Sequence, residues 1–432
     1  TVYGRLTGLA SRFAVHQGRV VAFAMADGPV LAERLVACMM SGAIAFPLPA
    51  GATAPEREAA LAGLDVALLL ESALGEDAPD ALWLPPSADD VALLVGTSGS
   101  TGRPKRVALR YGGLAWNALA HAEALELPDG VKTLIASPLY HAFPLVAQLL
   151  ATWLKGGAVG FLGSAFTPRG LLKRIEADGI GYVALTPTSL RLLRERCPEA
   201  TLPPILSVGA APMPAGELMA AAAWAGANGA AFYHTYGLSE AGPRVATLGP
   251  DDLDRHPASV GRLLPGVEVR LVDPETGLDA EDEGELWLRS PSLMAGYHPA
   301  LDGLEPDGWL RTGDRARLAD GILTLTGRLK DIIVSGGTTV SLREIEEALL
   351  LEPRVLEAAV VGVPHPIYGE VPRACLVAQG PITRQETIHH LAGLLSRHKL
   401  PQEVVFLSDL PRTALGKVDK AKLKELPCEA SP

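Results

Sequence analysis

The stretch TSGSTGRPK, from Thr97 to Lys105, consists mainly of glycine and small hydroxyl residues and ends on a proline and a lysine. Glycine costs backbone entropy in regular structure, and hydroxyls compete with the backbone for hydrogen bonds, so the stretch predicts a loop. The apolar run before it, residues 91–95, predicts a buried strand. A strand that opens into such a loop offers free amides and hydroxyls, which indicates binding of an anion, usually a phosphate.

Two other phosphate-binding motifs do not fit this loop. A Walker loop needs a lysine directly after its last glycine, but Gly102 is followed by Arg103 and Pro104, and no helix is predicted to begin there. The dinucleotide fingerprint GxGxxG is also absent from the loop. A plain flexible turn would not need four hydroxyl residues interleaved with glycines ahead of a lysine.

The composition predicts an ordinary soluble globular protein rather than a nucleic-acid-binding protein. The 432 residues are enough for two or three domains, with 48% hydrophobic and 20% charged residues. The net charge of −11 disfavours binding to nucleic acid or to an anionic membrane surface. The cysteines are scattered and form no CxxC pair, which favours a reducing, cytoplasmic location and argues against a structural zinc; they are Cys38, Cys197, Cys375 and Cys428.

Two segments bear on membrane targeting. Residues 1–13 hold two arginines and lack an apolar core, so no signal peptide is expected. Residues 35–55 carry no charge, but Gly42, Pro47 and Pro49 interrupt them. A buried helix that runs into a buried strand is therefore expected there, rather than a membrane span.

The order of strands and helices predicts an α/β fold. Residues 19–25, 29–41 and 43–47 are expected as strand, helix and strand of a parallel sheet buried on both faces. The alternation continues with strands at 132–136, 158–162 and 182–185 and helices at 142–154, 171–178 and 188–196. From about residue 261, short alternating runs at 267–273, 284–288 and 321–326 predict a mainly antiparallel piece. A small α+β tail follows, with helices at 342–351 and 384–397 and strands at 355–363 and 373–378.

The phosphate loop resembles that of the adenylate-forming enzymes, the superfamily of acyl- and aryl-CoA synthetases, stand-alone adenylation domains and luciferase-like ligases. That family's loop reads [ST]SG[ST]TGxPK, and residues 97–105 match it throughout. Further segments resemble the family's motifs in the family's order: SPLYHAF at 137–143, GAAP at 209–212, YGLSE at 236–240, TGD at 312–314, GRLKD at 327–331 and PRTALGK at 411–417.

The resemblance implies a fold and a two-step reaction. The expected fold has a large N-terminal α/β sandwich with a β-rich subdomain over residues 1–329, and a small mobile α+β domain over residues 330–432, with the hinge at Lys330. ATP and Mg²⁺ would convert a carboxylic acid to an acyl-adenylate with release of pyrophosphate. The acyl group would then pass to coenzyme A or to the phosphopantetheine of an acyl carrier protein. A ligase that uses a non-thiol acceptor and a nucleotide-binding pseudo-enzyme remain alternatives, and the oligomeric state is open.

The resemblance also assigns roles to residues. Both reactants are anions, so positioning and charge neutralisation supply most of the catalysis. Lys417 would bridge the α-phosphate and the attacking carboxylate, Glu240 would hold Mg²⁺, and His141 would border the acyl pocket. ATP or AMP would contact Thr97, Ser98, Gly99, Ser100, Thr101, Gly102, Lys105, Gly209, Ala210, Ala211, Tyr236, Gly237, Ser239, Asp314 and Arg328. The thiol tunnel would include Gly337, and the acyl pocket would include Phe143, Val183, Thr186, Ser207 and Ala241.

The substrate is only broadly specified. The residues after His141 include no acidic side chain, which disfavours an α-amino acid. The small, apolar pocket residues suit an aryl acid or a medium-chain fatty acid. Arg244 would meet a second carboxylate if it faced the pocket, but it is expected on the surface.

Overall fold

The computed structural model describes residues 2–72, 85–97, 105–163, 166–335, 338–413 and 418–427. The chain forms two compact units. The larger unit consists of Thr1–Val269, Trp287–Arg311 and Leu318–Thr324, and the smaller unit consists of Arg270–Leu286, Thr312–Arg317 and Leu325–Pro432. No helix of the described residues combines the length and the apolar character that crossing a membrane requires.

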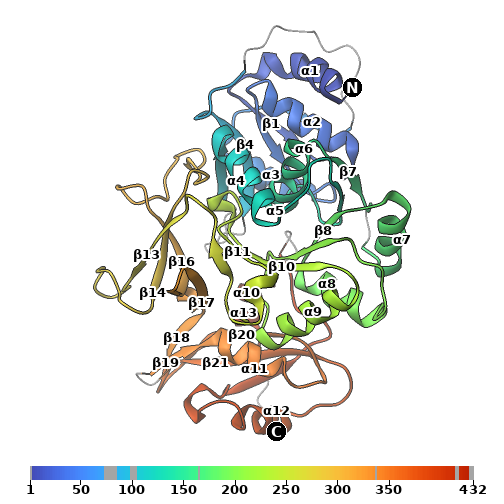
Figure 1. Cartoon of the computed structure of the whole chain (residues 1–432). Helices are drawn as coiled ribbons and strands as arrows, with labels where there is room; N and C mark the ends of the chain where they lie inside the picture. The colour runs from blue at the N-terminus through green and yellow to red at the C-terminus, as the bar shows by residue number, and fades with distance from the viewer. Residues whose placement is uncertain are drawn as a thin grey trace. The chain divides into compact units, whose positions relative to one another are not determined.

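One sheet of the larger unit begins with the predicted strand–helix–strand repeat (Figure 1). The predicted elements are confirmed with slightly shorter bounds: β1 (Val20–Phe23) pairs in parallel with β2 (Ile44–Pro47), and α2 (Pro29–Met40) joins them. Every residue of both strands is buried, as expected for a sheet covered on both faces. The strand order is β15 (Gly296–Tyr297), β5 (Lys105–Arg110), β4 (Val91–Thr97), β2, β1, β3 (Val66–Leu70).

A second sheet of the larger unit has helices on both faces. Its strands follow the order β12 (Gly261–Leu263), β11 (Ala246–Leu248), β10 (Ala231–Tyr236), β9 (Ile205–Val208), β8 (Tyr182–Leu185), β6 (Lys132–Ile135), β7 (Ala158–Phe161). On one face, α7 (Pro168–Asp178), α8 (Pro187–Arg196) and α9 (Ala215–Ala227) enclose an apolar core. The other face meets α4 (Tyr111–Ala124) and the helical run α5 (Ala142–Pro144), η2 (Leu145–Leu150) and α6 (Ala151–Leu154). The predicted helix at 142–154 is thus confirmed, with a π-helical middle.

The side chains of β8 alternate between these two faces, and this alternation places residues in the site. Val183 and Leu185 belong to the core beneath α7, α8 and α9. Tyr182 points the other way, because its hydroxyl lies 3.2 Å from Nε2 of His121 on α4. Successive residues of a strand point to opposite faces of the sheet, so Tyr182 and Val183 lie in different environments although they are neighbours in the sequence.

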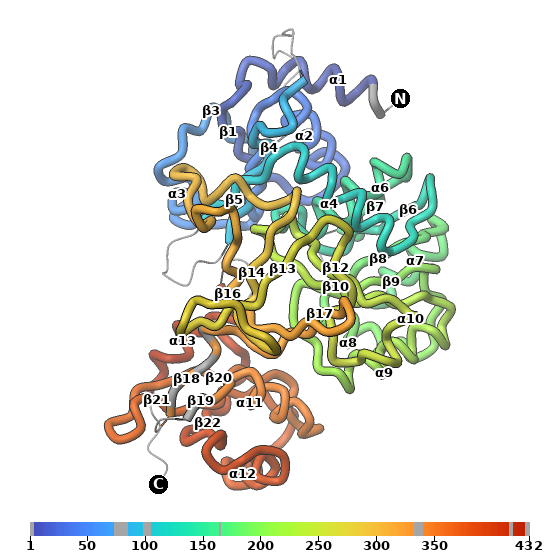
Figure 2. The backbone as a smooth tube through the Cα atoms, turned by 60° about the vertical axis from the view of Figure 1, so that its left-hand side comes forward, coloured from blue at the N-terminus to red at the C-terminus, as the bar shows by residue number. Residues whose placement is uncertain are grey.

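The smaller unit contains the remaining strands. Strands β13 (Glu268–Val272), β14 (Gly284–Arg289), β16 (Leu310–Ala319) and β17 (Ile322–Arg328) neighbour one another in that order, and each contributes half or more of its residues to this unit. A separate sheet of this unit has the strand order β19 (Thr338–Ser341), β18 (Ile332–Ser335), β21 (Gly369–Ala378), β20 (Val355–His365). The strand β22 (Glu403–Phe406) also pairs with β21. In Figure 2 these strands lie together with α11 (Leu342–Leu349) and α12 (Arg384–Ala392). The predicted helix at 384–397 is too long, since α12 ends before Gly393.

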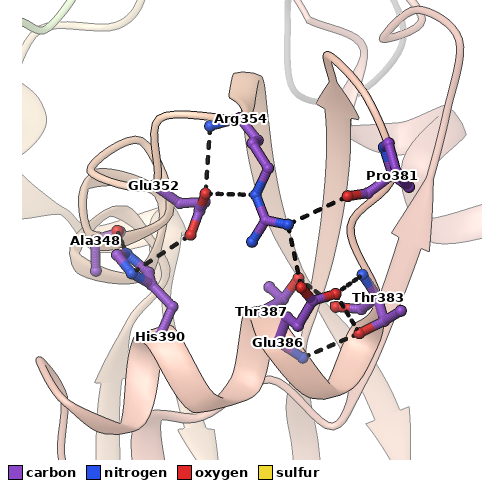
Figure 3. Close-up of polar contacts among 8 residues, drawn as sticks. All are labelled: Ala348, Glu352, Arg354, Pro381, Thr383, Glu386, Thr387 and His390. Carbon is purple, nitrogen blue, oxygen red and sulfur yellow. Dashed lines mark hydrogen bonds and ion pairs between the residues drawn. The ribbon is translucent and has the colours of Figure 1, made fainter.

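A polar network fixes α12 to the sheet of the smaller unit (Figure 3). Arg354 donates to Glu352 Oε1 at 2.8 Å and to Glu386 Oε1 at 3.1 Å. Glu386 forms a capping box with Thr383 at the start of α12, because each side chain accepts from the other's backbone N–H. One arginine thus joins the turn before β20 to the N-terminus of α12.

Candidate active site

The predicted phosphate loop joins two antiparallel strands. Thr97 is the last residue of β4, Lys105 is the first of β5, and the two pair across the hairpin. The expectation that no helix follows the loop is confirmed, since β5 begins at Lys105. Ser98, Gly99, Ser100, Thr101 and Gly102 lie outside the described residues. The hairpin therefore fixes both ends of the segment that is predicted to bind phosphate.

Lys105, Tyr297 and Glu240 form a small constellation beside this hairpin. Tyr297 lies on β15, where it pairs with Val107 of β5. The Lys105 ammonium lies 4.4 Å from the centre of the Tyr297 ring. The Tyr297 hydroxyl donates a hydrogen bond of 2.9 Å to Glu240 Oε1. Two predicted ATP-site residues thus contact one tyrosine, which the motif comparison did not single out.

The segment at 209–211, predicted to contact ATP or AMP, follows β9. A Cβ atom on Gly209 would lie 2.4 Å from Oγ1 of Thr235, and one on Gly237 would lie 1.6 Å from the Pro243 carbonyl oxygen, so neither position has room for a side chain. Ala210 has a φ of 70°, which is uncommon for a residue with a Cβ atom and often marks a functional loop. Ala211 is exposed, Tyr236 is buried at the end of β10, and Ser239 begins the short helix η3 (Ser239–Ala241).

The structure brings together only part of the predicted acyl pocket. Val183 faces the core under α7, α8 and α9, whereas Ser207 lies on the opposite face, where its hydroxyl is 3.1 Å from that of Tyr182. Thr186 acts as the N-cap of α8, because its Oγ1 accepts from the backbone N–H of Ser189. Val183 and Ser207 therefore do not line one pocket.

One of the other predicted pocket residues, Phe143, contacts Arg244, whose environment the sequence predicted wrongly. Phe143 and Ala241 are buried, and the His141 ring lies tilted against that of Tyr140, with ring centroids 4.3 Å apart. The expectation that Arg244 lies on the surface is wrong: it is 2% exposed, and its guanidinium lies 4.3 Å from the centre of the Phe143 ring. Nothing in the sequence around Arg244, which follows Gly242 and Pro243, indicated that this residue is buried.

Asp314 and Arg328, both predicted to contact ATP or AMP, form an ion pair in the smaller unit. Arg328 Nε donates to Asp314 Oδ1 at 2.5 Å. Asp314 lies on β16 and is almost fully buried, while Arg328 ends β17 and is about half exposed. The preceding Thr312 hydroxyl accepts from the backbone N–H of Asp314 at 3.0 Å, which fixes the local turn.

The C-terminal candidates lie largely beyond the described part of the chain. Lys417 and Gly337 fall outside it, and of Lys330 only the backbone is described, in the short helix η4 (Leu329–Asp331). The segment that holds Lys417 begins and ends at a bridge between Arg412 and Val418.

Lys420, three residues beyond Lys417, forms a partly buried ion triad. Its Nζ lies 3.1 Å from Oδ1 of Asp331 and 3.0 Å from Oε1 of Glu346. Burial alone would lower the pKa of Lys420, but the two carboxylates raise it. The triad ties the start of α13 (Lys420–Glu425) to the predicted hinge, a link that no sequence motif indicated.

Comparison with known proteins gives a consistent result along the chain. The family model of AMP-binding enzymes matches residues 7–298, and that of the AMP-binding enzyme C-terminal domain matches residues 344–417. Feruloyl-CoA synthase from Amycolatopsis sp is 33% identical over 445 residues, covering 95% of this chain and 89% of that protein. Indoleacetate–CoA ligase from Aromatoleum aromaticum is 31% identical over 478 residues, covering 98% of this chain and 92% of that protein.

Solved structures confirm the fold class predicted from the sequence. O-succinylbenzoate coenzyme A synthetase from Bacillus subtilis, in complex with ATP and magnesium ion, has a TM-score of 0.87 at 26% identity, with 98% of this chain and 93% of that chain covered. The same enzyme in complex with its acyl-adenylate intermediate has a TM-score of 0.89 at 25% identity, with coverage of 99% and 93%.

Proposed function

The chain belongs to the family of AMP-binding enzymes and is an AMP-forming acid–thiol ligase, and we propose that it activates an aryl acid with ATP and Mg²⁺ and transfers the acyl group to coenzyme A. The relatives named for feruloyl and indoleacetate groups support an aromatic acid, and their names support coenzyme A as the acceptor. The phosphopantetheine of a carrier protein is the alternative acceptor that the experiment below includes.

The observation that carries this proposal is the grouping of Lys105, Tyr297 and Glu240 where the phosphate loop joins β5. Lys105 offers a cation to the phosphates of ATP, and Glu240 offers a hard carboxylate oxygen that is bound to the same tyrosine. Mg²⁺ prefers one or two carboxylates together with phosphate oxygens, so this donor set fits the ion. When bound, Mg²⁺ would neutralise phosphate charge; Tyr297 keeps the Glu240 carboxylate oriented by its hydrogen bond.

We also propose Asp314 as the ligand of the ribose. A carboxylate only accepts hydrogen bonds, so Asp314 suits the two hydroxyls of a ribose, and Arg328 holds the carboxylate in place. We further propose that Lys417 approaches the α-phosphate during adenylation, that Lys330 acts as the hinge and that Gly337 lines the thiol path. The described cysteines Cys38, Cys197 and Cys375 are free, which supports a cytoplasmic location.

The proposal is tested by acid-dependent release of pyrophosphate over a panel of aryl, short-chain and medium-chain acids. Lys417→Ala is expected to lower the rate with the preferred acid by about 100-fold, because it removes a cation from the reacting anions. Lys424→Ala, an exposed lysine on α13, is the matched control and should change little. Coenzyme A and a phosphopantetheinyl carrier protein are then offered separately to the preformed adenylate. ATP binding without acid-dependent pyrophosphate release would contradict the proposal and favour a nucleotide-binding pseudo-enzyme.

A further inference from the structure

The Arg244 guanidinium is buried without a matching acceptor. The residue is 2% exposed, and its Nε and Nη2 atoms have no hydrogen-bond partner within the described part of the chain. Its Nη1 atom makes one long contact of 3.5 Å to the carbonyl oxygen of Pro243. Burial lowers the pKa of Arg244 to about 10, so the group remains charged at neutral pH. Such a charge is costly unless an anion pairs with it.

The guanidinium lies against Phe143, one of the residues predicted to line the acyl pocket. It stacks over Phe143, which follows the PLYHA segment, at 4.3 Å from the ring centre. Tyr182 lies on the same side, and its hydroxyl lies 3.1 Å from Ser207 Oγ and 3.2 Å from His121 Nε2. Burial, and secondarily Arg244, holds the pKa of His121 well below its ordinary value, so the imidazole is neutral. None of these neighbours is an anion that would neutralise Arg244.

The backbone of Arg244 is held so that the side chain stays inside. The Asn117 side chain accepts from the backbone N–H of Arg244 at 3.1 Å and donates to its carbonyl oxygen at 2.8 Å. The same amide also donates to the carbonyl oxygen of Ala241 at 3.3 Å. Asn117, itself fully buried on α4, therefore fixes the whole segment after η3. A held arginine with two unused N–H donors is preorganised for a ligand.

We infer that Arg244 is a substrate-binding residue that recognises a second carboxylate on the acid, so that the substrate class is dicarboxylic acids. The inference rests on the proposed function, since it concerns the acid that is adenylated. The planar guanidinium can offer Nε and Nη2 side by side to the two oxygens of one carboxylate. An acid without that group would leave both donors unpaired, and a site of this kind discriminates strongly against such analogues.

The experiment compares acids in pairs that differ by one carboxyl group. Phenylacetic acid is paired with 2-carboxyphenylacetic acid, cinnamic acid with 4-carboxycinnamic acid, and butyric acid with glutaric acid. The measured quantity is kcat/KM for acid-dependent pyrophosphate release. The proteins are the wild type, Arg244→Gln and Arg244→Lys, with Arg34→Gln as the control. Arg34 is another buried arginine whose Nε lacks a partner, but it lies on α2 beside the other sheet.

The wild type should prefer at least one dicarboxylic acid over its partner by about 100-fold. Arg244→Gln should remove that preference, Arg244→Lys should restore part of it, and Arg34→Gln should leave it intact. AMP-induced thermal stabilisation of each variant reports whether it is folded. If Arg244→Gln does not fold, the inference about the substrate class is judged by whether the wild type prefers a dicarboxylic acid over its monocarboxylic partner.

Two outcomes would overturn the inference in different ways. A wild type that uses monocarboxylic acids at least as well as their partners would overturn the role of Arg244 and leave the proposed function standing. A wild type that releases no pyrophosphate with any acid of either panel would contradict the proposed function itself, and the inference with it.

Discussion

The Tyr297 hydroxyl donates a 2.9 Å hydrogen bond to the Glu240 carboxylate and thereby joins β15 of one sheet to the segment that follows β10 of the other. Burial, and then the charge of Glu240, raises the pKa of Tyr297 far above its ordinary value of 10.0. The phenol therefore keeps its proton at neutral pH and can donate to the carboxylate. The orientation of the proposed Mg²⁺ ligand thus depends on a residue 57 positions further along the chain.

Tyr297→Phe keeps the ring over Lys105 but removes the hydrogen bond to Glu240. We expect about 10-fold slower adenylation and a higher Mg²⁺ concentration at half-maximal rate, because a hydrogen bond to a charged group contributes about 1.5 kcal/mol. The measurement is pyrophosphate release against Mg²⁺ concentration. Tyr368→Phe, an exposed tyrosine of the smaller unit, is the control. An unchanged Mg²⁺ dependence in Tyr297→Phe would rule out the orienting role.

Asp314→Asn tests the proposed ribose site. The amide replaces a carboxylate that only accepts hydrogen bonds and also breaks the ion pair with Arg328. We expect AMP to bind roughly 30-fold more weakly, which corresponds to about 2 kcal/mol. Titration calorimetry with AMP measures the effect. Asp320→Asn, in the exposed turn between β16 and β17, is the matched control. Wild-type affinity in Asp314→Asn would exclude the carboxylate from nucleotide binding.

Lys420→Met leaves Asp331 and Glu346 without their shared cation. A fully buried pair that loses one partner costs about 3–5 kcal/mol; because this triad is partly exposed, we expect about 2 kcal/mol of lost stability. Denaturant unfolding of the full chain measures the change. Lys424→Met on the same helix should be close to neutral. The triad would be energetically unimportant if the two variants unfolded alike.

Glu386 gives the chain a pH-dependent contribution to stability. The hydrogen bonds from Thr383, and then from Arg354, lower the pKa of this carboxyl to about 2 from its ordinary 4.5. Because the folded-state pKa is depressed, the stabilisation is fully present above pH 4.5 and is lost as the pH falls toward 2. The melting temperature of the wild type should therefore exceed that of Glu386→Gln at pH 7, and the difference should shrink below pH 4.5. A difference that is constant from pH 7 to pH 3 would contradict this assignment.

Much of the fold was predictable because its signals are local. The strand, helix and strand around residues 20–47 follow from their apolar runs and from Gly42 between the helix and the second strand, and the structure confirms them. The end of α12 was missed because residues 384–397 keep a helical pattern through Gly393, which interrupts the helix in the structure. Only one strand of the β4–β5 hairpin was predicted from the sequence. β5 was missed, because the position of an antiparallel partner strand is not fixed by the sequence of the first strand.

The site divides in the same way. The motifs by themselves determined which residue types the chain offers to a nucleotide. Each motif places its glycines, hydroxyls and single charges at fixed spacing within one short segment, so it can be recognised without knowledge of the fold. Which side chains meet is a property of packing between segments. Val183 was separated from Ser207 by the alternation of strand side chains. Tyr297 reached Glu240, Lys420 reached Asp331, and Arg244 was turned inward over Phe143, only because distant elements pack together. Burial sets the cost of an unpaired charge, and burial exists only once the chain has folded.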